Sequence, residues 1–149
     1  MVEVNGWNKA VEWMEKIKTI TSPRLKKGVV LTHNGFYFAD SPEATNSSNQ
    51  ITEEDYDRVI KKGAADVADM FMKTKRYAVR QTGSYSGKHI LEDRKGYYMT
   101  NGEFILASFI SGLFSGPEEW CCLVGGLAGN RSNVSLNIVL PMKLKELRH

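Results

Sequence analysis

The chain has 149 residues, 42% of them hydrophobic and 25% charged, with 20 basic and 17 acidic side chains and a net charge of +3. These proportions exclude an intrinsically disordered or fibrous protein. A chain of this length has room for one hydrophobic core, so we expect a single globular domain over residues 1–149.

The cysteines and the apolar segments indicate an intracellular, cytoplasmic protein with no membrane partner. Cys121 and Cys122 are adjacent, and neighbouring residues do not reach ordinary disulfide geometry without strain. Residues 1–16 mix charged with apolar side chains, unlike a secretory signal. The longest apolar run, 104–114, is too short to cross a bilayer.

An amphipathic helix and a hairpin are predicted at the start of the chain. Apolar residues at three- and four-residue spacing predict the helix over about residues 6–20. Two short apolar runs around Asn34-Gly35 predict a β-hairpin at 29–38. His33 falls in its turn, where a lone histidine is typical of a solvent-facing side chain.

A loop and a long helix follow the hairpin. Residues 39–50 are rich in Ser, Asn and Pro, which predicts a mobile surface loop. Thr52 is expected to cap a helix whose first turn is acidic and whose apolar stripe continues to Lys73.

The second half of the chain alternates helices and strands. Thr100 and Glu103 form a predicted capping box before a helix so apolar that it must be buried. The expected elements are a strand at 76–80, a glycine-flanked turn at 83–87, helices at 88–94, 104–114 and from about 117 to 123, and a strand at 134–140.

Together these elements predict an α+β fold, mainly helical, with a small β-sheet. The sheet is expected to combine the hairpin at 29–38 with the strands at 76–80 and 134–140. The apolar helix 104–114 should then pack between this sheet and the helix 52–73.

The region from Lys73 to Lys95 has a local excess of positive charge. It has seven basic residues against two acidic ones, whereas the rest of the chain has a small acidic excess. Tyr77, Tyr85, Tyr97 and Tyr98 lie in or beside it. Basic side chains interleaved with aromatic ones are typical of surfaces that bind phosphate backbones and stack bases.

No pattern in the sequence indicates catalysis, and we expect no enzyme, cofactor or metal site. The glycine spacing before Lys88 is one residue short of a phosphate loop, and His89 follows where such loops have Ser or Thr. Ser84, His89 and Glu92 are close in sequence, but the spacing of the last two is typical of a local pair on one helix.

A pattern over residues 84–110 resembles short proteins of phages and other large DNA viruses. It reads S-Y-x-x-K-H-x-x-E, followed by Y-x-x-N-G-x-F-I, and begins at Ser84 and Tyr98 respectively. Those proteins have no agreed activity, so the resemblance implies a viral source and an infected cell or virion as the setting. It implies no catalytic residue.

The function that these observations favour is non-enzymatic binding of DNA or RNA through the basic, tyrosine-bearing surface of residues 73–98. Four phosphate contacts would give a salt slope of roughly −3 to −4. The alternative is a protein-binding inhibitor of a host factor, acting against host defence, or a virion structural component, using the same basic face on an acidic protein. The candidate contact residues are Arg76, Arg80, Tyr85, Lys88, Arg94, Lys95 and Tyr97.

Overall fold

Helices make up most of the fold that a computed structural model gives for residues 6–19, 28–39, 41–74, 82–113, 139–140 and 142–145. The longer helices are α1 (Gly6–Ile17), α4 (Lys61–Met70), α5 (Ser84–Lys95) and α6 (Asn101–Ile110). Shorter helical segments lie before α4: α2 (Pro42–Thr45), the 3₁₀ turn η1 (Ser47–Asn49), α3 (Glu53–Asp55) and the π-helical η2 (Tyr56–Ile60). The expected α+β, mainly helical fold is confirmed.

The strands form two-stranded antiparallel pairs. β1 (Val29–Thr32) and β2 (Gly35–Phe38) make the predicted hairpin. β3 (Phe71–Lys73) pairs with β6 (Met142–Leu144), and β4 (Thr82–Gly83) pairs with β5 (Val139–Leu140). Within the described residues the hairpin is a sheet of its own, and β5, the described end of the predicted last strand, pairs with β4.

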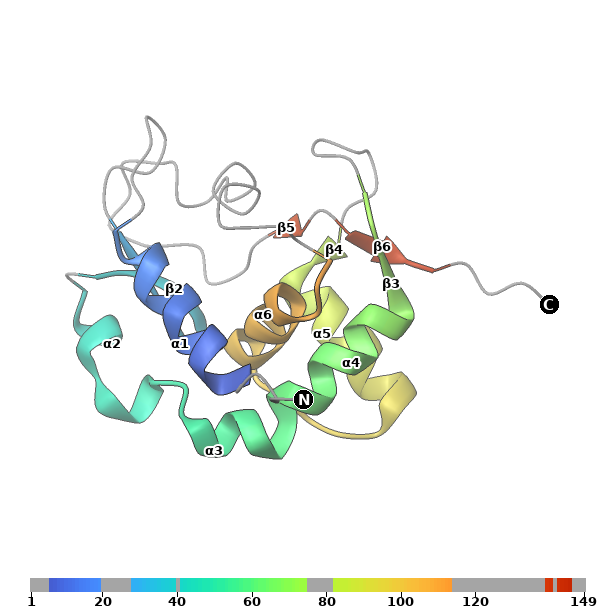
Figure 1. The fold of residues 1–149 in the computed structure, drawn as a ribbon, viewed down its shortest axis with the longest axis horizontal. Coiled ribbons are helices and arrows are strands. Elements are labelled where there is room, and N and C mark those ends of the chain that lie inside the picture. The colour runs from blue at the N-terminus through green and yellow to red at the C-terminus, as the bar shows by residue number, and fades with distance from the viewer. Residues whose placement is uncertain are drawn as a thin grey trace, which may run out of the picture.

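Helix α6 lies at the centre of the fold, with α1, α4 and α5 around it (Figure 1). Its residues Phe104 to Ala107 are fully buried. The ring of Trp13 on α1 stacks on Phe109 with centroids 4.5 Å apart. The apolar helix contacts both α4 and the hairpin, as its all-round hydrophobicity predicts.

The predicted ends of two helices are wrong. Each of these helices ends earlier than its apolar pattern suggested. The helix after Thr52 runs only to Met70, because Phe71 is extended and starts β3. Phe71 is still fully buried, so its side chain fits the helical stripe although its backbone pairs with Leu144 instead. Helix α6 ends at Ile110, shortly before Gly112, whose φ is +89°.

Two predicted loops are helical instead. In the segment 39–50, Ser41 caps α2 and Asn46 caps η1, so polar residues that suggested a loop are helix caps. Helix α5 begins at Ser84 with Gly83 as its cap, where a glycine-flanked turn was expected. The predicted strand 76–80, the helix from about 117 and most of the strand 134–140 lie outside the described residues.

Candidate functional site

The turn of the hairpin is held against the start of α6. The register pairs Thr32 with Gly35, so His33 and Asn34 form the turn, and Gly35 has a φ of +123°. The backbone N–H of Gly102 donates to the carbonyl oxygen of His33 at 2.8 Å, and the N–H of His33 donates to the carbonyl of Asn49 at 2.8 Å. These bonds fix where the His33 ring can point.

Two helices that begin near this turn have the same kind of start. The predicted capping box at α6 is confirmed: Thr100 N donates to Glu103 Oε1 at 2.7 Å, and Glu103 N donates to Thr100 Oγ1 at 3.2 Å. At α3, Thr52 N donates to Asp55 Oδ2 at 2.9 Å, and Asp55 N donates back to the Thr52 hydroxyl. Each cap therefore fixes one carboxylate at a helix N-terminus.

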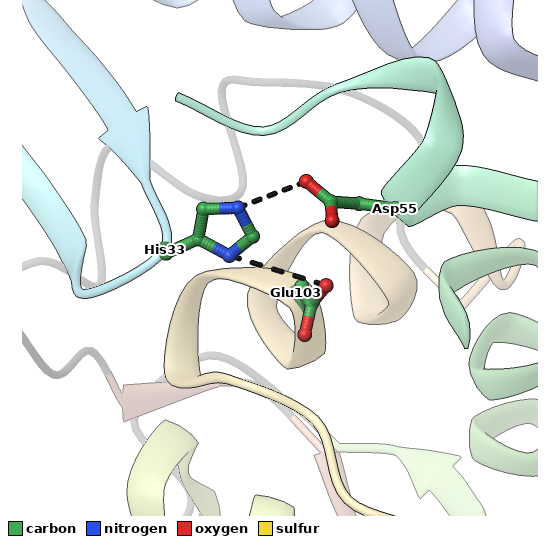
Figure 2. Close-up of side chains that lie close together, drawn as sticks. All are labelled: His33, Asp55 and Glu103. Atoms are coloured by element: carbon green, nitrogen blue, oxygen red, sulfur yellow. Dashed lines mark ion pairs between the residues drawn. The ribbon is translucent and has the colours of Figure 1, made fainter. Parts of the chain in front are cut away.

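The His33 ring lies between these two carboxylates (Figure 2). Its Nε2 is 2.8 Å from Asp55 Oδ2, and its Nδ1 is 3.9 Å from Glu103 Oε2. The same Nδ1 is 3.1 Å from Thr100 Oγ1. A neutral ring satisfies these contacts if its Nε2–H donates to Asp55 and the Thr100 hydroxyl donates to Nδ1.

Arg58 on η2 contacts both carboxylates. Its Nη2 donates to Glu103 Oε2 at 2.5 Å and to Asp55 Oδ1 at 3.3 Å. The Glu103 side chain is completely buried, whereas the Arg58 side chain is 51% exposed. We call His33, Asp55, Arg58, Thr100 and Glu103 the His33 cluster.

The His33 cluster was not predicted from the sequence. His33 is partly buried and bonded, so the expectation of a solvent-facing histidine is wrong. Among the described residues, His33, Asp55 and Glu103 each offer a ligand-type atom, and these atoms lie within 4.8 Å of one another. The available signal was a turn histidine together with two Thr-x-x-acid patterns.

The Asp55 carboxyl should make the stability depend on pH in acid. Burial acts to raise the pKa of this carboxyl, but the hydrogen bond from Thr52 N, the charge of His33 and the side-chain hydrogen bonds from Arg58 and Thr52 outweigh it, so the net pKa lies below the ordinary value of 3.8. A lowered folded pKa gives stability that is present above the unfolded pKa and is lost as the pH falls through the folded one. We expect Asp55→Asn to flatten the pH dependence of the urea midpoint below about pH 4. An unchanged acid limb would contradict this.

The candidate contact residues are only partly on one surface. Arg76 and Arg80 lie outside the described residues, whereas Tyr85 and Arg94 are exposed on α5. Lys88 is buried, and its Nζ donates to Glu92 Oε2 at 3.0 Å. The expectation that Lys88 lies on a solvated face is therefore wrong, because its stem packs inward and its charge is paired.

Lys95 and Tyr97 are also engaged with acids of α4. Lys95 Nζ lies 3.3 Å from Asp69 Oδ2 and 3.7 Å from Asp66 Oδ1. The Tyr97 hydroxyl donates to Asp66, and the Nζ of Lys62 lies 4.1 Å from the Tyr97 ring centroid. Burial and this hydrogen bond to a carboxylate raise the pKa of Tyr97 above its ordinary value. Tyr97 is therefore a poor candidate for base stacking.

Tyr97 was expected to be an exposed binding residue, but it is Tyr98 that is exposed. Tyr98 is 66% exposed and Tyr85 is 53% exposed. The Nζ of Lys88 lies 4.9 Å from the Tyr98 ring centroid and 5.5 Å from that of Tyr85. His89 packs edge-on against Tyr85 at 4.4 Å. We call Tyr85, Lys88, His89 and Tyr98 the tyrosine face.

Replacing Lys88 by alanine should destabilise the fold by about 1–2 kcal/mol, because Glu92 would lose a buried partner while still accepting from the Met99 N–H at 3.1 Å. Chemical unfolding of the variant measures this. Lys88→Met, which keeps the apolar stem, is the control that separates packing from charge. A loss of stability below about 0.5 kcal/mol for Lys88→Ala would show that Lys88 behaves as a solvated surface residue.

Ser84, His89 and Glu92, which are close together in sequence, have structural roles in α5. Ser84 is buried in the first turn of α5. His89 Nδ1 lies 3.3 Å from Glu92 Oε1, which confirms the expected local pair. Cys121 and Cys122 lie outside the described residues.

Comparisons with protein-family models, with curated proteins and with solved structures gave no match. Among the described residues, no helix is long and apolar enough to cross a membrane.

Proposed function

We propose that this protein is a non-enzymatic binding protein and that its tyrosine face docks on a partner protein. The observation that carries the proposal is the exposure of Tyr85 and Tyr98, whose rings both lie near the Nζ of the buried Lys88, which is paired with Glu92. Exposed tyrosines beside paired charges are typical of protein interfaces, where Tyr is a frequent source of binding energy.

The charge pairs made by the lysines of α5 favour a protein partner over nucleic acid. Lys88 and Lys95 are each paired with acids, so a phosphate backbone would have to compete with Glu92, Asp66 and Asp69. Alternating acids and bases orient a protein partner, whereas nucleic acid favours a continuous positive stripe. The partner expected from the sequence was an acidic protein. The paired charges favour a protein partner whose own surface has both acidic and basic side chains.

Nucleic-acid binding, which the sequence alone favoured, becomes the second candidate. The two exposed tyrosine rings that would anchor a protein could equally stack bases. The basic residues between Lys73 and Arg80 directly precede β4 and α5 in the chain and would supply the phosphate contacts. The resemblance to phage and large DNA-virus proteins fits both candidates: a host factor or virion protein on the first, and DNA or RNA on the second.

A capture experiment with nuclease separates the two candidates. We expect the wild-type chain to retain one protein from host lysate whether or not the lysate is treated with nuclease. Changing Tyr85→Ser and Tyr98→Ser together should reduce this capture at least about tenfold, since interface tyrosines often contribute more than 1.4 kcal/mol. Thermal melts of the double variant should change little, because both rings are mostly exposed.

Met72→Ser is the matched control, because Met72 is another exposed apolar side chain, on β3. It should capture as the wild type does. Capture that disappears with nuclease and weakens steeply with salt would replace the protein partner by nucleic acid. Capture by the double variant equal to that of the wild type would show that the tyrosine face is not the docking surface.

A further inference from the structure

We infer that His33, Asp55 and Glu103 form a binding site for a divalent transition-metal ion, and that the Arg58 guanidinium stands in for the ion when no metal is bound. The inference is independent of the tyrosine face. It starts from the convergence of one imidazole and two carboxylates, from three separate elements, within 4.8 Å (Figure 2).

The charges of the His33 cluster favour a doubly charged cation. With a neutral imidazole, two carboxylates and one guanidinium leave a net charge of −1 around the fully buried Glu103 side chain. Burying uncompensated charge is unfavourable, and buried carboxylates are usually paired or bound to metal. A divalent ion in place of Arg58 would bring the sum to zero.

Both carboxylates can bind an ion without giving up their helix caps. Glu103 uses Oε1 for the cap and turns Oε2 toward Arg58. Asp55 uses Oδ2 for the cap and turns Oδ1 toward Arg58. The oxygens that would ligate the ion are therefore the two that now accept from Arg58 Nη2.

The His33 ring already lies next to a group that could accept the outer hydrogen bond that metal-bound imidazoles usually make. If Nε2 ligates the ion, Nδ1 carries the proton and donates it to Thr100 Oγ1, which is 3.1 Å away. Such a bond fixes both the tautomer and the orientation of the ring. The ring then keeps its place in the turn, and its proton moves from Nε2 to Nδ1.

Arg58 can leave because its side chain is half exposed. Ligand atoms about 2.1 Å from a tetrahedral ion are about 3.4 Å apart. The ligand-type atoms of the three residues lie up to 4.8 Å apart, so some of them would have to close in by about 1.4 Å. One nitrogen and two carboxylate oxygens suit Mn²⁺, Fe²⁺ or Zn²⁺ better than Cu⁺, which prefers sulfur. Further coordination positions would be filled by water.

Mn²⁺ titration, followed by the loss of the free-ion electron paramagnetic resonance signal, tests the inference on the full chain. We expect one ion to bind, and Arg58→Gln to bind it at least about tenfold more tightly because a competing charge is removed. Zn²⁺ should displace the Mn²⁺, as the order of divalent affinities requires. Mn²⁺ is chosen because thiolates such as those of Cys121 and Cys122 bind it weakly.

Arg94→Gln is the matched control, since it removes an exposed arginine from α5, and it should bind as the wild type does. Asp55→Asn and His33→Gln, each combined with Arg58→Gln, should abolish the tight binding. If Arg58→Gln folds only with Mn²⁺, the inference is also supported. The inference is overturned if Arg58→Gln binds Mn²⁺ no more tightly than Arg94→Gln does. It is also overturned if the tight binding survives Asp55→Asn and His33→Gln, or if an unfolded Arg58→Gln variant stays unfolded when Mn²⁺ is added.

Discussion

Replacing Gly102 by alanine should lower the free energy of unfolding by about 3 kcal/mol or more. A Cβ on Gly102 would lie 1.7 Å from the carbonyl oxygen of Thr32 and 3.0 Å from the carbonyl carbon of His33. Both neighbours are backbone atoms, so the hairpin and α6 would have to separate. Separation would also break the Gly102 N–H to His33 bond and move the ring away from both carboxylates.

Urea unfolding measures this loss, and Gly83→Ala is the control. A Cβ on Gly83 would meet nothing within 4 Å, and its φ of −69° suits any residue. That variant should change the stability by less than about 1 kcal/mol, because the smaller chain freedom of alanine in the unfolded state and its poorer N-cap propensity act in opposite directions. A Gly102→Ala variant that unfolds within about 1 kcal/mol of the wild type would show that the close approach does not constrain the fold.

Replacing Glu103 by alanine should also lower the free energy of unfolding by about 3 kcal/mol. The change removes one half of the capping box at α6 and leaves Arg58 without its buried partner. Removing the ion pair costs less than it would for a fully buried pair, because Arg58 is half exposed and can turn to solvent. Urea or thermal unfolding at neutral pH measures the total.

Glu103→Gln separates the two contributions. Its amide oxygen can still accept from the Thr100 N–H, so the cap remains, whereas the charge that faces Arg58 is removed. We expect about half the effect of the alanine variant. Equal losses for the two variants would mean that the cap contributes little and that the ion pair with Arg58 accounts for the whole effect.

The features that the sequence predicted well depend on residues a few positions apart. Thr100 and Glu103 are three residues apart and satisfy each other's backbone amides, so their pattern is readable without the fold. The hairpin is similar, since its register follows from a two-residue turn. The burial of α6 was predictable because no face of that helix is polar.

The features that were missed depend on contacts between distant parts of the chain. Phe71 keeps the helical stripe of its neighbours, yet it is a strand residue because Met142 to Leu144 pair beside it. Lys88 reads as a surface charge until Glu92 and the two tyrosines are placed around it. His33, Asp55 and Glu103 come from three elements, so no local pattern could join them.

The pairing of β3 with β6 has a consequence for the order of folding. It joins residues about 70 positions apart, whereas the helices are built from bonds between near neighbours. Closing so long a loop is slow until other contacts bring its ends together, and the packing of α4 and α5 on α6 can do so. We therefore expect β5 and β6 to join a helical core that has already formed, so that these two strands are among the last of the described elements to fold.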